Sequence, residues 1–515
     1  MHTRYHLPAG CSDQRLLLAV AGSQKQINMI GTLSLDLTSW ILLTDLVIRF
    51  SFSLRIIMRK RAASISFAWL TIILLLPFVG AVTYLLFGEN RLGERRASRL
   101  LKGRPILKQW ATSLREIPAV DWQAVNPECR PLNQQIFTTT GMPTMPGNQL
   151  ELIDTAELFF SRLITDIDRA HFNCSLEFYI FNEGGGVDAV IEALIRAQER
   201  GVTCRLLLDS IGSKPFLRSQ SANRLRKAGV EIREALPAGL IRALFIRIDL
   251  RNHRKIVVID NEIAYTGSQN LVDPKFFRQD EQVGEWVDAM VRLTGPVVEL
   301  LAAGFLFDWL LERRQWPTRL KKMIGIQPVS AAGDALVQLV PSGPGYGESS
   351  IHDFLLTAIY AARHELVLTT PYFVPDNAIL AALRSAAQRG VEVTIIVPET
   401  NDSRLVHYAS RANFTTLSQA GIRIMFFSGG LLHTKTITVD NDFCLFGSVN
   451  LDMRSFWLNF EMTLVIYDQV FTNTLRSLQQ AYLHRSHQLD LAVFNNRPYR
   501  QQLLENIALL IGPLL

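Results

Sequence analysis

Cysteine is scarce in this sequence, and its distribution excludes two common structural roles. Only five cysteines occur among 515 residues, and no two of them form a Cys-x2-Cys pair. Disulfide frameworks need an even and dense set of cysteines, and zinc sites need closely spaced cysteines and histidines. We therefore predict no disulfide framework and no metal site, with inert roles for Cys11, Cys129, Cys174, Cys204 and Cys444.

Signals for nucleotide binding, nucleic-acid binding and cleavage by a signal peptidase are also missing. The run Gly184-Gly185-Gly186 has no Gly-x4-Gly-Lys-Ser/Thr pattern near it, so a flexible turn is the better interpretation. There is no obvious stripe of basic and aromatic residues for nucleic acid. The first 28 residues lack a positive-then-apolar layout. We interpret residues 1–32 as a leader, with Met29 as an alternative start.

Charge and size leave several classes of partner open. The net charge is +6 and the sequence pI is about 9.1, which favours an anionic lipid surface, a phosphate-bearing substrate or nucleic acid. The hydrophobic content of 48% lies at the upper edge for a soluble protein. The length is sufficient for about two to four domains.

The longest uncharged apolar run covers residues 65–87. A helix of about 20 apolar residues crosses a bilayer, and such helices tolerate the proline and glycine that this run contains at Pro77 and Gly80. A weaker run at about 37–57 carries Asp45 and Arg49, which can pair on one helix face. An interfacial helix is the alternative for this weaker run.

We therefore predict a transmembrane hairpin within residues 33–90, followed by a basic, proline-containing linker over residues 91–135. The larger number of basic residues after the second span favours both termini inside and a short loop outside. This topology predicts a multi-pass membrane protein with its remaining domains on the cytoplasmic side.

Beyond the linker the same succession of strand-like and helical patterns occurs twice. The strand-like run 174–182 is followed by a helical pattern, an Arg-Gly-Val turn at 200–202 and a second apolar strand. The run 365–370 opens the same succession, with Arg-Gly-Val at 389–391. Such alternation predicts an α/β fold with mixed sheets in two tandem domains, residues 136–328 and 329–515.

Each half also contains the signature His-x-Lys-x4-Asp-x6-Gly-Ser-x-Asn with identical spacing. The period of two along a strand places its histidine and lysine side by side on one face. Glycine allows the chain to return closely, so that serine and asparagine offer hydrogen bonds beside this pair. The residues are His253, Lys255, Asp260, Ser268 and Asn270 in the first half, and His433, Lys435, Asp440, Ser448 and Asn450 in the second. We predict that the histidines, lysines and aspartates of both sets are catalytic.

This set of side chains fits the cleavage of a phosphodiester. The reaction needs a nucleophile, a proton donor for the leaving oxygen and compensation of the charge on the phosphoryl oxygens. Two facing half-sites supply all three in one composite site. One histidine attacks phosphorus to form a phosphohistidine and the other donates the proton, while the lysines, serines and asparagines bind phosphate. Asp288 and Glu461 are the predicted acceptors that orient the histidines, with Glu281 competing with Asp288.

These residues resemble the phospholipase D superfamily, and specifically the bacterial cardiolipin synthases. The resemblance includes the strings Leu250–Lys255, Ala264–Ser268, Thr370–Asp376 and Asn450–Phe456. It implies attack of one phosphatidylglycerol on another, giving cardiolipin and glycerol without a cofactor, with phosphatidylglycerol and anionic membrane lipids as partners and no nucleic acid. It also implies that His253 is the nucleophile and His433 the general acid, and the mirror assignment stays open. The oligomeric state is not determined.

Three alternatives compete with phosphatidyl transfer. Water can attack a phosphohistidine, so a phospholipase D-type phosphodiesterase that hydrolyses phospholipids is one alternative. A nuclease of the same superfamily is favoured by the positive charge but not by a membrane anchor. A non-enzymatic membrane scaffold is expected to have lost catalytic residues, whereas both sets are intact here.

Overall fold

The computed structural model describes residues 37–59, 63–89, 92, 96–103, 105, 120–237, 247, 249–312, 328–346 and 350–511. The chain divides into two compact units, Met1–Glu89 and Asn90–Leu515, and each is described by itself. The predicted leader, with Met29 and Cys11, lies outside the described residues.

The first unit contains the first helix of the predicted hairpin. Residues 37–58 form one helix, which matches the predicted range of about 37–57. The guanidinium of Arg49 lies 2.7 Å from the carboxylate of Asp45, so the predicted pairing on one helix face is confirmed. Arg55 near the C-terminal end of the same helix pairs with Glu89 at 2.7 Å.

The second helix of the hairpin is not the single element that we predicted over residues 65–87. Three shorter elements replace it, namely α2 (Ala63–Leu75), α3 (Pro77–Thr83) and the π-helical turn η1 (Tyr84–Gly88). The prediction of one unbroken helix is therefore wrong. Among the described residues, none of the helices combines the length and the apolar character that crossing a bilayer requires.

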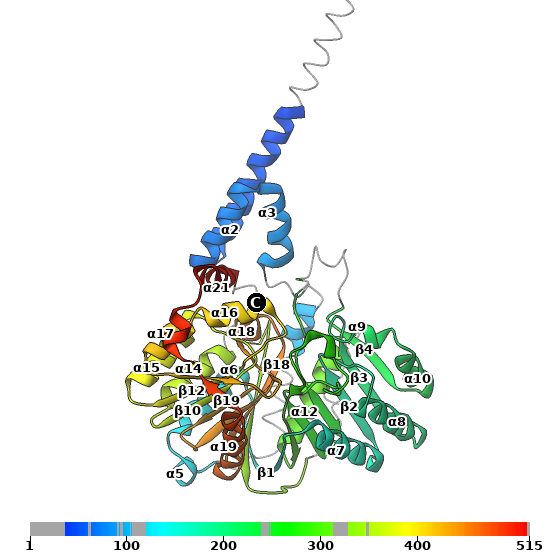
Figure 1. Ribbon diagram of the computed structural model, residues 1–515. Helices are drawn as coiled ribbons and strands as arrows, with labels where there is room; N and C mark the ends of the chain where they lie inside the picture. The colour runs from blue at the N-terminus through cyan, green and yellow to red at the C-terminus, as the bar shows by residue number, and fades with distance from the viewer. Residues whose placement is uncertain are drawn as a thin grey trace, which may run out of the picture. The chain divides into compact units, whose positions relative to one another are not determined.

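The break at Leu76 has a local cause in the sequence. Leu76 adopts φ −133° and ψ 69°, because a following proline disfavours the helical conformation and Pro77 itself has no amide hydrogen to donate. Helix α3 then packs back against α2, as Figure 1 shows. A side chain at Gly80 would collide with the carbonyl of Ile72, so glycine permits this close approach.

The second unit is built on one mixed sheet whose strand order repeats. The first-half strands run outward from the middle as β1 (Thr144–Ile153), β8 (Met290–Thr294), β6 (Ile263–Gly267), β5 (Ile256–Ile259), β2 (Asn173–Phe178), β3 (Thr203–Asp209) and β4 (Glu231–Ala235). The second-half strands run outward in the equivalent order as β9 (Ala335–Ser342), β18 (Glu461–Tyr467), β16 (Phe443–Gly447), β15 (Thr436–Val439), β10 (Glu365–Thr369), β12 (Glu392–Pro398), β13 (Arg423–Phe427) and the edge strand β19 (Ser486–Gln488).

The two halves of this sheet are joined by β1 and β9, which pair antiparallel. In each half the three outer repeated strands are parallel and the others are antiparallel. The predicted α/β fold with mixed strand directions is confirmed. The sheets expected for two tandem domains are, however, continuous with one another.

Helices cover both faces of the sheet. The first half contributes α7 (Ala156–Arg169), α8 (Gly186–Glu199), α9 (Lys214–Leu217), α10 (Gln220–Ala228) and α12 (Val297–Leu311). The second half contributes α14 (Ser350–Ala361), α15 (Asn377–Gln388), α16 (Arg404–Arg411), α17 (Phe414–Gln419), α18 (Met453–Trp457), α19 (Gln469–His484), α20 (Leu491–Asn495) and α21 (Tyr499–Ile511). Short elements near the centre are β7 (Trp286–Val287), η2 (Gln279–Glu281), β11 (Phe373–Val374), β14 (Leu431–Leu432) and β17 (Leu451–Asp452).

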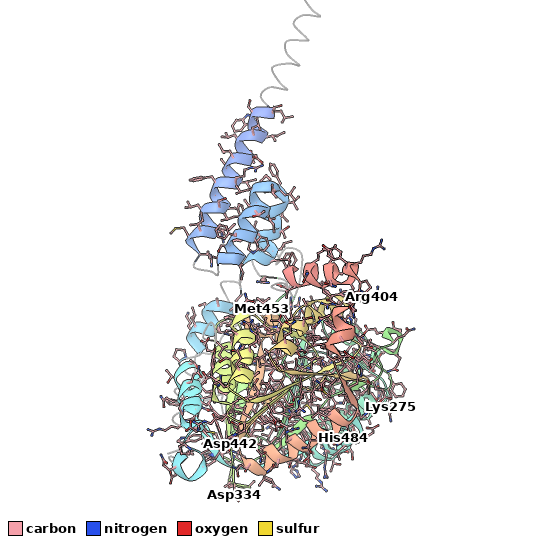
Figure 2. All side chains as sticks on the ribbon, turned by 60° about the vertical axis from the view of Figure 1, so that its left-hand side comes forward. Lys275, Asp334, Arg404, Asp442, Met453 and His484 are labelled. Atoms are coloured by element: carbon pink, nitrogen blue, oxygen red, sulfur yellow. The ribbon has the colours of Figure 1, made fainter. Side chains whose placement is uncertain are left out.

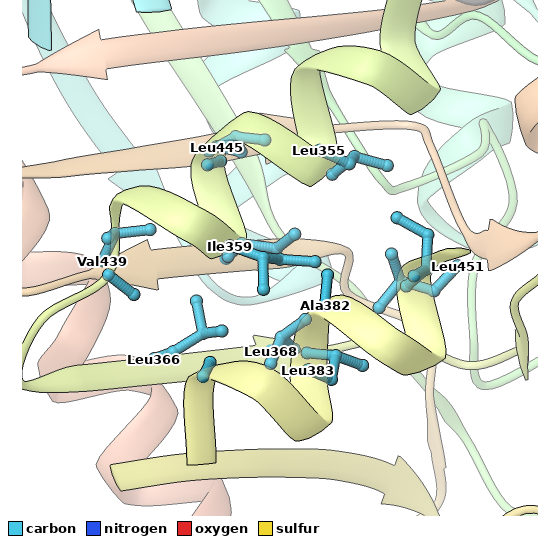
Figure 3. Packing of buried hydrophobic residues seen from close by; sticks show 14 of the residues in the cluster. Leu355, Ile359, Leu366, Leu368, Ala382, Leu383, Val439, Leu445 and Leu451 are labelled. Atoms are coloured by element: carbon cyan, nitrogen blue, oxygen red, sulfur yellow. The ribbon is translucent and has the colours of Figure 1, made fainter. Parts of the chain in front are cut away.

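Apolar periodicity and caps explain where these helices lie. Helix α15 begins after Asp376, whose side chain accepts the amide of Ile379, and its inner face is buried. In Figure 3, Leu355 and Ile359 of α14 pack with Leu383 of α15 over apolar side chains of the sheet. The four cysteines among the described residues are buried in these apolar cores and form no disulfide bond with one another.

The predicted linker and domain boundary need correction. Helices α5 (Trp122–Val125) and α6 (Cys129–Thr140) occupy the end of the 91–135 range, and α6 crosses the predicted start of the first domain at residue 136. Helix α6 packs against α14 and β9 of the second half, where it buries Leu132 and Ile136. The amphipathic pattern of α6 therefore belongs to the core rather than to a linker.

Candidate active site

Backbone hydrogen bonds between the two halves hold the motif histidines. The amide of His253 donates to the carbonyl of Phe460 at 2.9 Å, and the amide of Phe460 donates to the carbonyl of Arg251 at 2.8 Å. In the other half-site, the amide of His433 donates to the carbonyl of Val287 at 2.8 Å, where β14 pairs with β7. Each motif histidine is thus hydrogen-bonded to the backbone of the opposite half of the unit.

This docking places a carboxylate of the opposite half beside each imidazole. The Nδ1 atom of His253 lies 2.9 Å from Glu461, and the Nδ1 atom of His433 lies 2.7 Å from Asp288. Both predicted acceptors therefore contact a motif histidine, and each acts across the repeat rather than within its own half. The competitor Glu281 lies in η2 and pairs with Arg278 instead.

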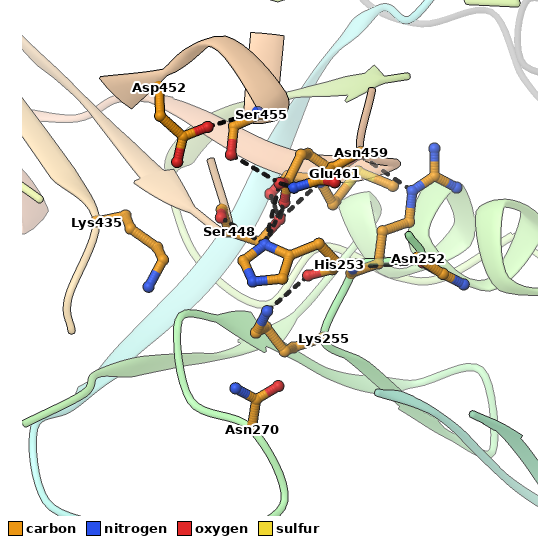
Figure 4. Close-up of polar contacts among 12 residues, drawn as sticks. Asn252, His253, Lys255, Asn270, Lys435, Ser448, Asp452, Ser455, Asn459 and Glu461 are labelled. Carbon is orange, nitrogen blue, oxygen red and sulfur yellow. Dashed lines mark hydrogen bonds and ion pairs between the residues drawn. The ribbon is translucent and has the colours of Figure 1, made fainter. Parts of the chain in front are cut away.

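The motif lysines lie beside the histidines on the same side of the site. The Nζ atom of Lys255 donates to the carbonyl of His253 at 2.7 Å, and Lys435 makes the same contact with His433. In Figure 4 the second ring nitrogen of His253 faces the space between Lys255, Lys435 and Asn270. Both ammonium groups are buried, so this space concentrates positive charge.

The two motif asparagines occupy equivalent positions after the Gly-Ser pair. The Oδ1 atom of Asn270 accepts the amide of Ile180 at 3.1 Å, which orients the side chain. The Oδ1 atom of Asn450 is buried and has no hydrogen-bond partner among the described residues. A buried carbonyl oxygen without a donor is a group that a hydroxyl of a bound ligand can satisfy.

The serines of the motif have a different position from the one predicted. The hydroxyl of Ser448 lies 2.5 Å from Glu461 and accepts the amide of Met462 at 3.0 Å. The hydroxyl of Ser268 accepts the amide of Ala289 at 3.0 Å and donates to its carbonyl at 3.2 Å. The prediction that these serines bind phosphate needs correction, because their hydroxyls instead hold the segments that carry the carboxylates.

The predicted catalytic role of the motif aspartates also needs correction. Each follows the far end of its strand, β5 or β15, and adopts a positive φ in a tight turn with the asparagine after it. Each carboxylate accepts three successive backbone amides at 2.7–2.8 Å, from His171, Phe172 and Asn173 for Asp260 and from Arg363, His364 and Glu365 for Asp440. Because the histidines lie at the opposite end of these strands, the aspartates serve the turn rather than the reaction.

Burial and the neighbouring charges set the ionisation of the site. Burial lowers the pKa of His253 to about 4 and that of His433 to about 3, although the facing carboxylates act in the opposite direction. Burial also raises the pKa of Asp288, but the contact with His433 outweighs it and lowers the value to about 2. The site without substrate therefore holds neutral imidazoles beside ionised carboxylates.

The pKa values of the two motif lysines are also lowered. Burial is the main cause that lowers the pKa of Lys255 to about 7 and that of Lys435 to about 8, and the charge of Lys435 lowers the pKa of Lys255 further. Part of the lysine population is thus neutral near pH 7 to 8. A bound phosphodiester brings negative charge into the same space, which raises the pKa of lysines and histidines alike.

Several residues near the site were missed from the sequence. The hydroxyl of Ser455 donates to Glu461 at 3.1 Å, and the amide of Asn459 donates to it at 3.3 Å. Aromatic rings flank the imidazoles, with ring centroids 5.1 Å apart for Tyr179 and His253 and 4.4 Å apart for Trp286 and His433. For Ser455, Asn459 and Trp286 the signal was a position within a few residues of a motif or of an acid that contacts one, whereas Tyr179, directly after β2, had no such signal.

A buried charge cluster supports the first half-site only. Arg254, between the histidine and the lysine, is fully buried and pairs with Asp308 of α12. Glu177 of β2 accepts the amide of Asn252 at 2.6 Å, and burial raises its pKa well above the usual range. In the second half the equivalent of Arg254 is Thr434, which hydrogen-bonds within the core. A carboxylate in the otherwise apolar strand β2 was the sequence signal for this cluster.

Comparisons with known proteins give the family of this chain. A family model described as "Cardiolipin synthase, PLD-like domain" matches residues 163–305 and 355–482, which together exceed half of the chain. Cardiolipin synthase A of Edwardsiella ictaluri is 46% identical over 465 residues, covering 90% of this chain and 96% of that protein. The chain belongs to the cardiolipin synthase family.

Other matches extend this assignment. Cardiolipin synthase A of Yersinia pseudotuberculosis is 46% identical over 463 residues, covering 90% of this chain and 95% of that protein. Residues 47–89 of this cardiolipin synthase family member match a model described as "Phospholipase_D-nuclease N-terminal". The crystal structure of phosphatidylserine synthase from Haemophilus influenzae matches with a TM-score of 0.57 at 15% identity, over 75% of this chain and 100% of that one, which shows a shared fold.

Proposed function

We propose that this chain transfers a phosphatidyl group from one phosphatidylglycerol to another, giving cardiolipin and glycerol. The observation that carries the proposal is the pair of interlocked half-sites, in which His253 contacts Glu461 and His433 contacts Asp288. The family membership supports the choice of phospholipid as the substrate class.

In the first step His253 acts as the nucleophile. Glu461 accepts the Nδ1 proton of His253, so the lone pair on the other ring nitrogen is free to attack phosphorus. The nitrogen–phosphorus bond forms as the bond from phosphorus to the glycerol oxygen breaks. His433, protonated once the anionic substrate raises its pKa, gives its proton to the departing glycerol.

In the second step the roles of His433 reverse. The headgroup hydroxyl of a second phosphatidylglycerol attacks phosphorus while His433 accepts the hydroxyl proton. The phosphorus–nitrogen bond to His253 breaks and cardiolipin leaves. No net proton is consumed, because His433 donates one proton in the first step and recovers one in the second.

The charge on the phosphoryl oxygens is compensated by the buried groups that face the same space. Lys255 and Lys435 supply positive charge, and Asn270 and Asn450 supply amide groups. A preorganised donor of this kind is worth about 3 kcal/mol of transition-state stabilisation in water-excluded sites. The flanking rings of Tyr179 and Trp286 keep water from the imidazoles, which favours transfer over hydrolysis.

We also assign the chain to the bacterial inner membrane, with the hairpin of residues 33–90 as its attachment and the second unit on the cytoplasmic side. The match of residues 47–89 to an N-terminal family model supports this part of the proposal. Phosphatidylglycerol and other anionic lipids are then the partners, without a cofactor and without nucleic acid.

The decisive test supplies the full chain with vesicles in which phosphatidylglycerol, labelled in its headgroup, is the sole phospholipid. Cardiolipin and free glycerol in equal amounts are expected, with no nucleotide added. Phosphatidic acid as the sole lipid product would establish the hydrolase alternative and overturn the transferase. A His253→Ala chain is the blank, since it lacks the nucleophile.

A further inference from the structure

Helix α21 presents large apolar side chains to solvent, whereas an ordinary surface helix buries its apolar face against the protein. Along α21 the side chains of Tyr499, Leu503, Ile507 and Leu510 follow one another at spacings of three or four residues and form a single stripe. All four are exposed, and Leu510 retains 81% of its accessible surface. We call these four residues the α21 stripe.

The polar side of α21 faces the protein and fixes this orientation. Glu505 is fully buried, and its carboxylate pairs with Arg411 at 3.1 Å and with Arg497 at 2.7 Å. Turning the helix to bury the stripe would expose an apolar residue such as Ala508 and break both ion pairs. The stripe therefore stays outward, because removing one partner of a buried ion pair is strongly unfavourable.

The surroundings of the stripe are basic. Arg500 on α21 and Arg404 on the neighbouring helix α16 are exposed, and Figure 2 shows Arg404 beside α21. The sequence of α16 contains no acidic residue, and the single acid of α21 is the buried Glu505. An apolar stripe with exposed arginines at its border has the character of an interfacial helix that meets anionic lipid.

The stripe is also connected to the second half-site. Ala508 on the inner side of α21 packs with Val406 of α16 and Val374 of β11, in one buried cluster against which Tyr372 packs. The ring of Tyr372 lies edge-on to the ring of His433, with centroids 6.5 Å apart. This buried cluster and the ring of Tyr372 thus lie between α21 and a motif histidine.

We propose that the α21 stripe docks into the surface of an anionic bilayer and holds the second half-site at the level of the lipid headgroups. This inference rests on the proposed function, because a reaction between two bilayer lipids requires the site to lie at the membrane surface. A second copy of the chain fits less well, since the exposed arginines beside the stripe would repel their counterparts.

Spin labelling of the full chain tests the docking. A nitroxide is attached to Leu510→Cys, and the chain is reconstituted into vesicles of phosphatidylglycerol and phosphatidylethanolamine. Val470→Cys on α19 is the matched control, because Val470 is an apolar residue of similar exposure, 76%, on a different helix. The unsubstituted chain serves as the labelling blank.

Collision rates with oxygen, which partitions into lipid, and with a water-soluble nickel chelate give the environment of each label. We expect the label at position 510 to favour oxygen by several fold over the label at 470 in vesicles. Equal access of the nickel chelate to both labels would overturn the proposal. Dipolar broadening between labels at position 510 would assign the stripe to a second copy and also overturn it.

A kinetic test separates this inference from the proposed function. The double variant Leu503→Gln with Leu510→Gln is expected to raise the apparent KM for phosphatidylglycerol in vesicles by about tenfold, the effect of about 1.4 kcal/mol of lost lipid contact. Turnover of dissolved short-chain phosphatidylglycerol should be unchanged, as should every parameter of a Val470→Gln control. An unchanged KM on vesicles would overturn the docking while the transferase stands, whereas a wild-type chain that makes no cardiolipin defeats the proposed function.

Discussion

At the scale of residues, the two histidines differ in what surrounds them although their motifs are the same. His253 shares its acid Glu461 with three further side chains, those of Ser448, Ser455 and Asn459, whereas Asp288, the acid of His433, is also hydrogen-bonded to Ser268. A carboxylate that accepts several hydrogen bonds is held in one position and stays ionised. The imidazole of His253 is thus the more firmly oriented of the two, as expected of a nucleophile.

The division of labour between the histidines predicts which variants a better leaving group can rescue. On phosphatidylglycerol, His433→Ala is expected to lower kcat by about 10² to 10⁴, the usual contribution of general acid catalysis. On a phosphatidyl ester of p-nitrophenol, whose leaving group departs without a proton, the burst of nitrophenol in the first turnover should recover most of the wild-type rate, because only the second step still needs His433 as the base. His253→Ala should recover nothing on either substrate. The reverse pattern would make His433 the nucleophile.

The pKa values predict a bell-shaped dependence of kcat/KM on pH. Protonation of His253, whose pKa is lowered to about 4, removes its lone pair, so the rate should fall below about that pH. Deprotonation of the lysines, with pKa values of about 7 and 8, weakens the binding of phosphate, so the rate should fall above this range. A Lys255→Arg chain should shift the alkaline limb upward, because Lys255 has the lower pKa of the two lysines and a guanidinium keeps its charge. A wild-type profile that stays flat to pH 10 would contradict this account.

At the scale of elements, the long signature divides into two parts with different tasks. The histidine and lysine lie at the end of β5 or β15 that meets the other half, and the aspartate lies at the opposite end. Asp260 and Asp440 each tie the turn after their strand to the start of a neighbouring strand, β2 or β10. Their fixed spacing therefore reflects the length of a strand rather than the geometry of a reaction.

Substitution of a motif aspartate should thus change stability more than chemistry. Asp260→Ala leaves three backbone amides without their acceptor, and we expect a loss of about 1–3 kcal/mol in the free energy of unfolding. The kcat of the chain that remains folded should stay within a few fold of wild type. Asp168→Ala, which breaks an exposed pair with Arg196, is the control and should cost less than about 1 kcal/mol. Denaturant unfolding and active-site titration measure the two effects, and loss of kcat at unchanged stability would place Asp260 in the reaction.

At the scale of the whole molecule, two separate sets of contacts join the two repeated halves of the second unit. The sheet continues through β1 and β9, and the two histidine segments are exchanged between the halves. Gln338 lies at the junction, where it accepts the hydroxyl of Tyr467 at 3.0 Å and donates to the carbonyl of Met142 at 2.8 Å. Neither half has a complete site without the other.

This continuity predicts that the halves unfold together. Gln338→Ala orphans two buried polar groups and should lower the stability of the whole second unit by about 1–3 kcal/mol. Calorimetry of the full chain should show one transition for this unit, shifted as a whole, with equal calorimetric and van't Hoff enthalpies. The exposed Gln134→Ala is the control and should leave the transition in place. Two separate transitions would mean that the halves are independent domains.

Local rules in the sequence were sufficient for much of this molecule. The period of two in the motif strands placed each histidine beside its lysine, and the repeated order of strands and helices gave the α/β fold with its two halves. The carboxylates Asp288 and Glu461 could be named as candidates because each lies downstream of the motif in its own half, although Glu281 competed with Asp288. These features depend on residues that are close in the sequence, so the local hydrophobic pattern is sufficient to predict them.

What the tertiary structure decided concerns contacts between distant segments. It alone assigned Glu461 to His253 and Asp288 to His433, took the motif serines and aspartates out of the phosphate site, and ended the second hairpin helix at Leu76. The signature specifies which side chains are present, but their partners depend on how the two halves are joined. A hydrogen bond between residues some 200 positions apart leaves no local pattern, since only the folded sheet brings its donor and acceptor together.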